Sequence, residues 1–186
     1  MARRGRRCIV FDPLNQYKQK HSEFTIVVNT PVALKQYIKA NFSKDWKILY
    51  VPKEGTVLKH WKHVGRIAYG CGNLNLVLDE IGLLCEHGYY KKEIKGQDPI
   101  LESMVSFGRH RCVNIIATTQ VPSTVALHYR SLCCEMRLFQ IDEKAYLDYI
   151  QDRIGAAPTS LLPGLPKFTF VHWRDTGEFV KVKSKG

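Results

Sequence analysis

The chain has 186 residues, 45% of them hydrophobic, which is enough for one substantial core, and no linker or repeat divides it, so we expect a single domain over residues 1–186. Its 28 Lys and Arg against 17 Asp and Glu give a formal charge of +11, which favours a polyanionic partner such as DNA. No apolar run approaches the roughly twenty residues of a spanning helix, which excludes a membrane protein.

Short apolar runs alternate with helical patterns along the chain, which is typical of a mostly parallel sheet flanked by helices. Strands are expected at residues 8–11, 24–28, 46–51, 76–78, 113–118 and 135–140. Helices are expected at 31–41, 56–69, 100–107, 123–131 and 142–154, the last with Asp142 as its N-cap and Gly155 at its end. Residues 168–173 and 178–182 flank a turn sequence and predict a C-terminal hairpin.

The apolar run 76–78 ends abruptly in two adjacent carboxylates, Asp79 and Glu80. A buried strand that delivers acids at its carboxyl end suits the hydrolysis of phosphoanhydrides, because α/β proteins bind ligands at that edge. Asp79 would then hold Mg²⁺ through water, and Glu80 would polarise the attacking water. The alternative is a core strand that ends in a solvated acidic turn.

A second buried strand, 113–118, ends in Thr119 and Gln120 before a proline at position 122 stops it. Two parallel strands that end at one edge would place the acid pair beside this amide. The Gln120 side chain offers both a donor and an acceptor, so it can contact a γ-phosphate or orient water. The alternative is a Gln that only caps the following turn.

Two basic segments lie between these strands. Arg109 follows the predicted helix 100–107, and its guanidinium would stabilise charge on a phosphoryl group in a neighbouring subunit. For the adjacent His110 and Arg111, complementation of the helix dipole is the alternative. Lys91 and Lys92 follow two tyrosines in a segment without periodicity, which suits a nucleic-acid backbone or an ordinary solvated loop.

Taken in order, Leu-Val-Leu-Asp-Glu, Gly-Arg-His and Ile-Ile-Ala-Thr-Thr-Gln-Val-Pro-Ser resemble the FtsK/HerA superfamily of DNA-translocating ATPases. The resemblance spans about residues 6–179 and includes a strand-two pattern with an Asp-Pro at positions 12 and 13. It implies that Asp79 and Glu80 are the Walker B acids and Gln120 the strand-four sensor. It also implies that Thr119 binds nucleotide and that Arg109 is an arginine finger.

The resemblance implies a RecA-like (ASCE) fold, ATP and Mg²⁺ as cofactors, and a homo-oligomeric ring that moves double-stranded DNA. The small size and the His after Arg109 look most like viral genome-packaging ATPases, whose further partner would be a capsid vertex or portal protein. Zot-like phage assembly proteins are an alternative, although they usually add a membrane span. Six cysteines without a Cys-x-x-Cys pair favour a reducing cytoplasm, that of the host if the protein is viral, or a place in the virion.

The sequence departs from the family at the Walker A element, because no Gly-x-x-x-x-Gly-Lys-Ser/Thr is present. The family's first strand is missing with it, so strand 113–118 would lose one neighbour or pair directly with strand 135–140. A mis-called start, a separately encoded upstream peptide and a degenerate ATPase would each explain this. An alternative function follows: a catalytically inactive DNA-binding or ring-structural subunit.

Overall fold

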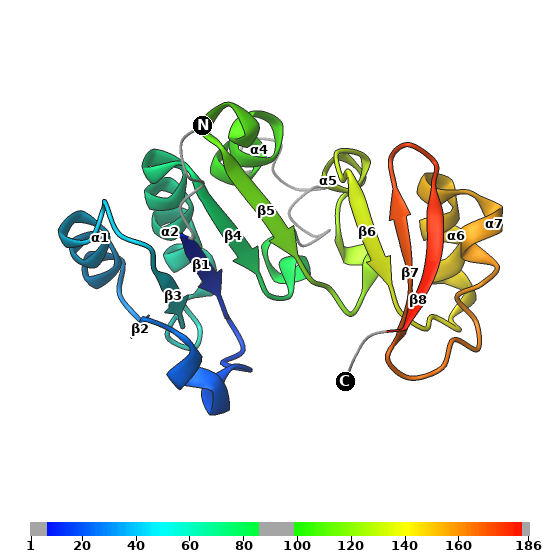
Figure 1. Cartoon of the computed structure of the whole chain (residues 1–186), viewed down its shortest axis with the longest axis horizontal. Coiled ribbons are helices and arrows are strands. Elements are labelled where there is room, and N and C mark those ends of the chain that lie inside the picture. The colour runs from blue at the N-terminus through cyan, green and yellow to red at the C-terminus, as the bar shows by residue number, and fades with distance from the viewer. Residues whose placement is uncertain (1–6, 86–98, 184–186) are drawn as a thin grey trace. The chain divides into compact units, whose positions relative to one another are not determined.

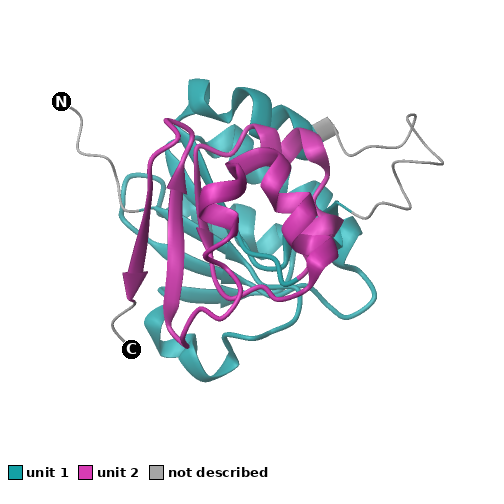
Figure 2. Ribbon diagram, turned by 90° about the vertical axis from the view of Figure 1, so that its right-hand side faces the viewer, with its two compact units in different colours: residues 1–120 teal, residues 121–186 magenta. Residues whose placement is uncertain are grey.

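The computed structural model describes residues 7–85 and 99–183. The chain divides into two compact units, residues 1–120 and 121–186, which Figure 2 colours separately. The single-domain organisation stays a prediction.

Unit 1 is built on a five-stranded parallel sheet in the order β2-β3-β1-β4-β5. Its strands, in chain order, are β1 (Cys8–Phe11), β2 (Ile26–Val28), β3 (Lys47–Tyr50), β4 (Leu74–Leu78) and β5 (Val113–Ala117). The central strands read as apolar runs because β1, β3 and β4 each have neighbours on both sides and bury most of their side chains. The mostly parallel sheet expected from the sequence is confirmed.

Three helices connect consecutive strands of this sheet (Figure 1). They are α1 (Pro31–Ala40), α2 (Val57–Cys71) and α4 (Pro99–Phe107). Each connection runs in the same direction along the sheet, so right-handed crossovers put all three helices on one face. The core lies between this layer and the sheet, where Trp61 of α2 packs edge-on against Phe11 with ring centroids 5.6 Å apart.

Strand β5 lies at the edge of the sheet, and among the described residues its only ladder partner is β4. Its side chain Ile116 is 48% exposed. Within the described part of the chain one edge of β5 therefore has no ladder partner, which is one of the two expectations from the sequence, and β6 belongs to a separate sheet. An apolar strand with unpaired backbone groups is a site where another strand can add.

Unit 2 contains an antiparallel sheet in the order β6-β7-β8 and a helix, α6, that packs on it (Figure 2). Its elements are α5 (Leu127–Ser131), β6 (Glu135–Leu138), α6 (Lys144–Ile154), α7 (Ala156–Thr159), β7 (Thr169–Arg174) and β8 (Phe179–Lys183). Strands β7 and β8 form the C-terminal hairpin, which confirms that prediction. Val171 and Trp173 of β7 pack against Ile150 and Ile154 of α6 to form the core of this unit.

Most predicted elements are present with shifted ends, and two details differ. Asp142 is not the N-cap of α6: that position is Glu143, which makes no side-chain cap. Asp142 instead accepts hydrogen bonds from the Gln140 side chain and from the Gly164 N–H, so its carboxylate is already engaged by a neighbouring loop. The predicted helix 123–131 begins as a 3₁₀ turn, Pro122–Thr124, and becomes α-helical only at Leu127.

Across the described ranges 7–85 and 99–183, no helix is both long enough and apolar enough to cross a membrane.

Candidate active site

The two acids predicted from the sequence lie where β4 ends. The Asp79 N–H donates to Phe11 O at 3.0 Å, so the ladder with β1 continues through this residue. Glu80 is the first residue to leave the strand, with a left-handed backbone at φ 52° and ψ 65°. Non-glycine residues cost about 1–2 kcal/mol in this conformation, and such positions concentrate at functional sites. The left-handed turn redirects the chain just beyond the buried Asp79.

Hydrogen bonds join the two acids that follow β4 to the residues that follow β5. Thr118 Oγ1 donates to Asp79 Oδ1 at 2.8 Å, and Thr119 Oγ1 donates to Glu80 Oε1 at 2.7 Å. The Gln120 N–H donates to Glu80 Oε2 at 3.0 Å. The structure therefore brings Asp79, Glu80, Thr119 and Gln120 together at the carboxyl rim of the sheet. It is the backbone of Gln120 that contacts the acid, while its side chain is exposed.

Thr118 contacts both acids, and sequence reasoning missed this role. Its hydroxyl accepts from the Glu80 N–H at 3.1 Å while it donates to Asp79, and its carbonyl accepts from Ile81 N at 2.8 Å. A hydroxyl can donate and accept at once, so one side chain fixes both acids. The sequence signal was two adjacent threonines at the end of a strand whose partner ends in two acids.

Asp79 is a buried acid. It is 6% exposed, and no described residue donates to its Oδ2 atom. Burial raises the pKa of Asp79, the hydrogen bond from Thr118 opposes that rise, and the negative charges of Asp12 and Glu80 add to it. A buried carboxylate oxygen without a donor suits Mg²⁺, which takes hard oxygen ligands and is commonly held by one or two carboxylates plus phosphates. The described residues contain no cluster of three metal-binding side chains, so phosphate oxygens or water would complete the coordination.

Asp12 is a third acid at this rim, at the end of neighbouring strand β1. It is fully buried, and its two oxygens accept from the N–H groups of Gln16 and Tyr17 at 3.0 and 3.1 Å. Burial raises the pKa of Tyr17, and the charges of Asp79 and Asp12 raise it further. The sequence pointed to Asp12 only through its Asp-Pro pattern. The structure makes it the acid that fixes the loop beside Asp79.

We predict that Asp79→Asn makes the fold more stable at pH 7. A raised folded-state pKa means that the native state binds the Asp79 proton more tightly than the unfolded chain does. The ionised carboxylate therefore destabilises the fold as the pH rises through that pKa, and a neutral side chain avoids this. In urea unfolding from pH 4 to 7.5, the advantage of the variant should grow with pH and vanish at the acid end.

Asp12→Asn is the matched control, with the opposite expected sign. An amide has one oxygen to accept from the two N–H donors of Gln16 and Tyr17, so this variant should be less stable at neutral pH. A wild-type protein more stable than Asp79→Asn at pH 7 would contradict the prediction.

Arg109 lies away from the acids of its own chain. It belongs to the 3₁₀ turn η3 (Gly108–Arg111), which leads into the amino end of β5, whereas Glu80 follows the carboxyl end of β4. Five residues of parallel strand span about 16 Å, so the two residues lie at opposite rims. The structure does not bring Arg109 to Glu80 within one chain. Lys91 and Lys92 lie outside the described residues.

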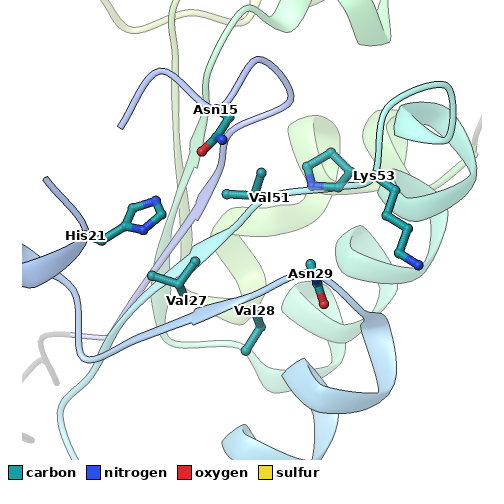
Figure 3. A pocket seen from close by; sticks show the side chains of 8 residues that line it. Asn15, His21, Val27, Val28, Asn29, Val51 and Lys53 are labelled. Carbon is teal, nitrogen blue, oxygen red and sulfur yellow. The ribbon is translucent and has the colours of Figure 1, made fainter. Parts of the chain in front are cut away.

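A shallow hollow of about 300 Å³ occupies the same rim farther along the sheet, where β2 and β3 end (Figure 3). Its lining combines polar side chains with valines and a proline: Asn15, His21, Val27, Val28, Asn29, Val51, Pro52 and Lys53. Neither acid of the β4 end lines it. Sequence reasoning did not anticipate this hollow, because its lining comes from three separate loops and strand ends.

No protein-family model and no curated protein matches the chain. Several solved structures, however, match the chain. The genome-packaging NTPase B204 from Sulfolobus turreted icosahedral virus 2, in complex with ATP-gammaS, matches with a TM-score of 0.72 and 15% identity over 96% of this chain and 82% of that one. Its complex with AMPPCP gives 0.71 and 16%, over 97% and 83%.

B204, the DNA-packaging ATPase from Sulfolobus Turreted Icosahedral Virus, gives a TM-score of 0.64 and 12% identity over 98% of this chain and 100% of that chain. Identities this low establish the fold and not the activity. The fold expectation and the structural side of the resemblance are confirmed: the chain shares the RecA-like fold of a viral genome-packaging NTPase.

Proposed function

We propose that the rim formed by β4 and β5 is the acid and sensor part of an ATP-hydrolysing site in a motor that moves double-stranded DNA, most like a viral genome-packaging ATPase. The observation that carries this proposal is the network that joins Asp79 to Thr118 and Glu80 to Thr119 and Gln120. A structural role alone does not require two acids, one of them buried with a free oxygen, on a single rim. The packaging NTPase B204, which has this fold, forms complexes with ATP-gammaS and AMPPCP.

Each residue has a distinct part in the proposed site. Asp79 would hold Mg²⁺ through water with its free Oδ2 atom, and Mg²⁺ would supply neutralisation of phosphate charge. Glu80, fixed by Thr119 and by the Gln120 N–H, would polarise the attacking water and take its proton. The exposed Gln120 amide would sense the γ-phosphate, with Thr119 beside it at the nucleotide.

A ring of identical subunits would bring Arg109 into use. Because Arg109 is exposed at the rim opposite its own acids, it would serve the site of a neighbouring subunit as an arginine finger. Its planar fork suits a phosphoryl group whose charge is developing. Such a ring would surround double-stranded DNA and, in a virus, would dock on a capsid vertex or portal protein.

The proposed site lacks a phosphate loop within residues 1–186, because no Gly-x-x-x-x-Gly-Lys-Ser/Thr is present. Without the backbone N–H groups and the lysine of such a loop, a triphosphate loses most of its ligands. We therefore predict that the 186-residue chain releases phosphate from Mg·ATP at the background rate, with or without duplex DNA, and that Glu80→Gln changes nothing. A steady rate that collapses in Glu80→Gln would contradict this and reveal another phosphate-binding element.

The second candidate, a catalytically inactive DNA-binding or ring subunit, is favoured by the same missing loop. The coding sequence directly upstream separates the two. If it encodes, in frame, an apolar strand and a phosphate loop, the extended product should hydrolyse ATP and depend on Glu80. An extended product that carries the loop and still fails to hydrolyse ATP would favour the inactive subunit.

A further inference from the structure

Helix α2 carries basic residues along one face, and the proposed ATP site does not use them. Lys59, Lys62, His63 and Arg66 are all exposed and recur at the i, i+3, i+4 and i+7 spacing of a single helix face. The opposite face is buried through Trp61, Val64, Gly65 and Ala68. Together with Arg111, these four basic residues are called the α2 basic band.

The band continues past the end of the helix through a rigid junction. The Asn73 N–H donates to Arg111 O at 2.8 Å, and the Arg111 guanidinium lies 4.8 Å from the centre of the Tyr69 ring. Gly72 permits this approach: its φ is +61°, and a Cβ there would come within 2.9 Å of Arg111 O. Turn η3 is thus fixed against the last turn of α2, so Arg111 is held in place at the end of the band.

Among the described residues, no acid pairs with the band. Neither α2 nor η3 contains Asp or Glu, and none of the five residues forms an ion pair within the described part of the chain. Burial lowers the pKa of the adjacent His60, and the positive charges of His63, Lys59 and Lys53 lower it further. The contribution of these charges to the lowered pKa of His60 indicates a locally positive surface.

An ordinary solvated helix in the same molecule looks different. On α6, the exposed Asp148 and Asp152 share the helix with Lys144 and the partly exposed Arg153. Mixed signs are usual for a helix face that only meets water. A single-sign row over two turns of α2, extended by Arg111, instead matches the electrostatic footprint of a protein that contacts phosphates.

We propose that the α2 basic band binds the phosphate backbone of double-stranded DNA. The choice of duplex DNA as the ligand rests on the proposed function. From Lys59 to Arg66 the helix rises about 10 Å, and duplex DNA presents about six phosphates along that length of its axis. The contacts are to the backbone and carry no sequence preference, which suits a protein that must move along DNA.

The test measures binding of the 186-residue chain to a fluorescent 30-base-pair duplex by anisotropy, without nucleotide, over a series of salt concentrations. The band variant is Lys59→Gln/Lys62→Gln/Arg66→Gln, and the matched control is Lys144→Gln/Lys181→Gln/Lys183→Gln, which removes three charges from exposed sites in unit 2. The band variant should lose at least ten-fold in affinity at low salt. Its slope of log K against log salt should fall in magnitude by about 2.7, since each lost phosphate contact contributes about 0.9.

The control should keep its salt slope within about one contact of wild type, and Arg66→Lys, which retains the charge, should bind like wild type. Equal losses in the band and control variants, or no loss in the band variant, would overturn the proposal. So would band-dependent binding to heparin or single-stranded DNA with none to the duplex. Because no nucleotide is present, these outcomes are independent of whether the rim at Glu80 hydrolyses ATP.

Discussion

Glu80→Gln is expected to lower ATP turnover by about 10²–10⁴-fold in a protein that unites this chain with a phosphate loop, because a positioned general base contributes that much to catalysis. An amide cannot take a proton from water. The substitution also affects the local hydrogen bonds, since the two Glu80 oxygens accept from Thr119 Oγ1 and from the Gln120 N–H. A glutamine offers one oxygen to these two donors, so its NH₂ group would face one of them.

The measurement is steady-state phosphate release, paired with binding of a fluorescent ATP analogue. Binding should change little, because in the proposed site the phosphates would be held mainly by the loop and by Mg²⁺ at Asp79. The matched control is Glu102→Gln, which makes the same chemical change at an exposed position of α4 and should leave turnover unchanged. A Glu80→Gln protein that retains more than a tenth of wild-type turnover would remove Glu80 from the role of base.

The proximity of the acids to Thr119 and Gln120 was predictable, because it follows from strand direction alone. In the sequence, strands 76–78 and 113–118 read as buried and parallel, and parallel neighbours end at one rim, as β4 and β5 do. Residues that directly follow both strands must then lie close together, whatever the details of packing. The sequence also assigned Arg109 to the site of a neighbouring subunit, and its place before β5, at the rim opposite Glu80, is compatible with that prediction without testing it.

The partners of the acids were not predictable, because they depend on register and on a backbone conformation. Pairing of Leu78 with Ala117 sets Asp79 beside Thr118 and Glu80 beside Thr119, and a shift of one residue would exchange these partners. The left-handed backbone at Glu80 occurs at a non-glycine residue, so the sequence gives no signal for it. The Asp142 error has a similar origin, since a loop donor at Gly164, far along the chain, competes for the capping carboxylate.

Trp61→Ala is expected to destabilise the fold by about 3–5 kcal/mol, the usual cost of removing a large aromatic side chain from a core. Trp61 is 1% exposed and packs edge-on against Phe11, which in turn stacks on Tyr50 with ring centroids 5.7 Å apart. A cavity here would loosen β1 and β3 directly beneath the rim, so Asp12, which follows Phe11, should also lose its fixed position.

Trp61→Phe separates the loss of packing from the loss of the indole N–H. Nε1 of Trp61 is buried, and no described residue accepts its hydrogen. Phenylalanine therefore keeps a ring against Phe11 and removes an unsatisfied donor, whose burial costs about 1–3 kcal/mol, so its net cost should be well below that of alanine. Urea unfolding followed by far-UV circular dichroism measures both variants. An alanine variant that loses less than about 1 kcal/mol would mean that α2 repacks onto the sheet, because an uncollapsed cavity of this size costs more.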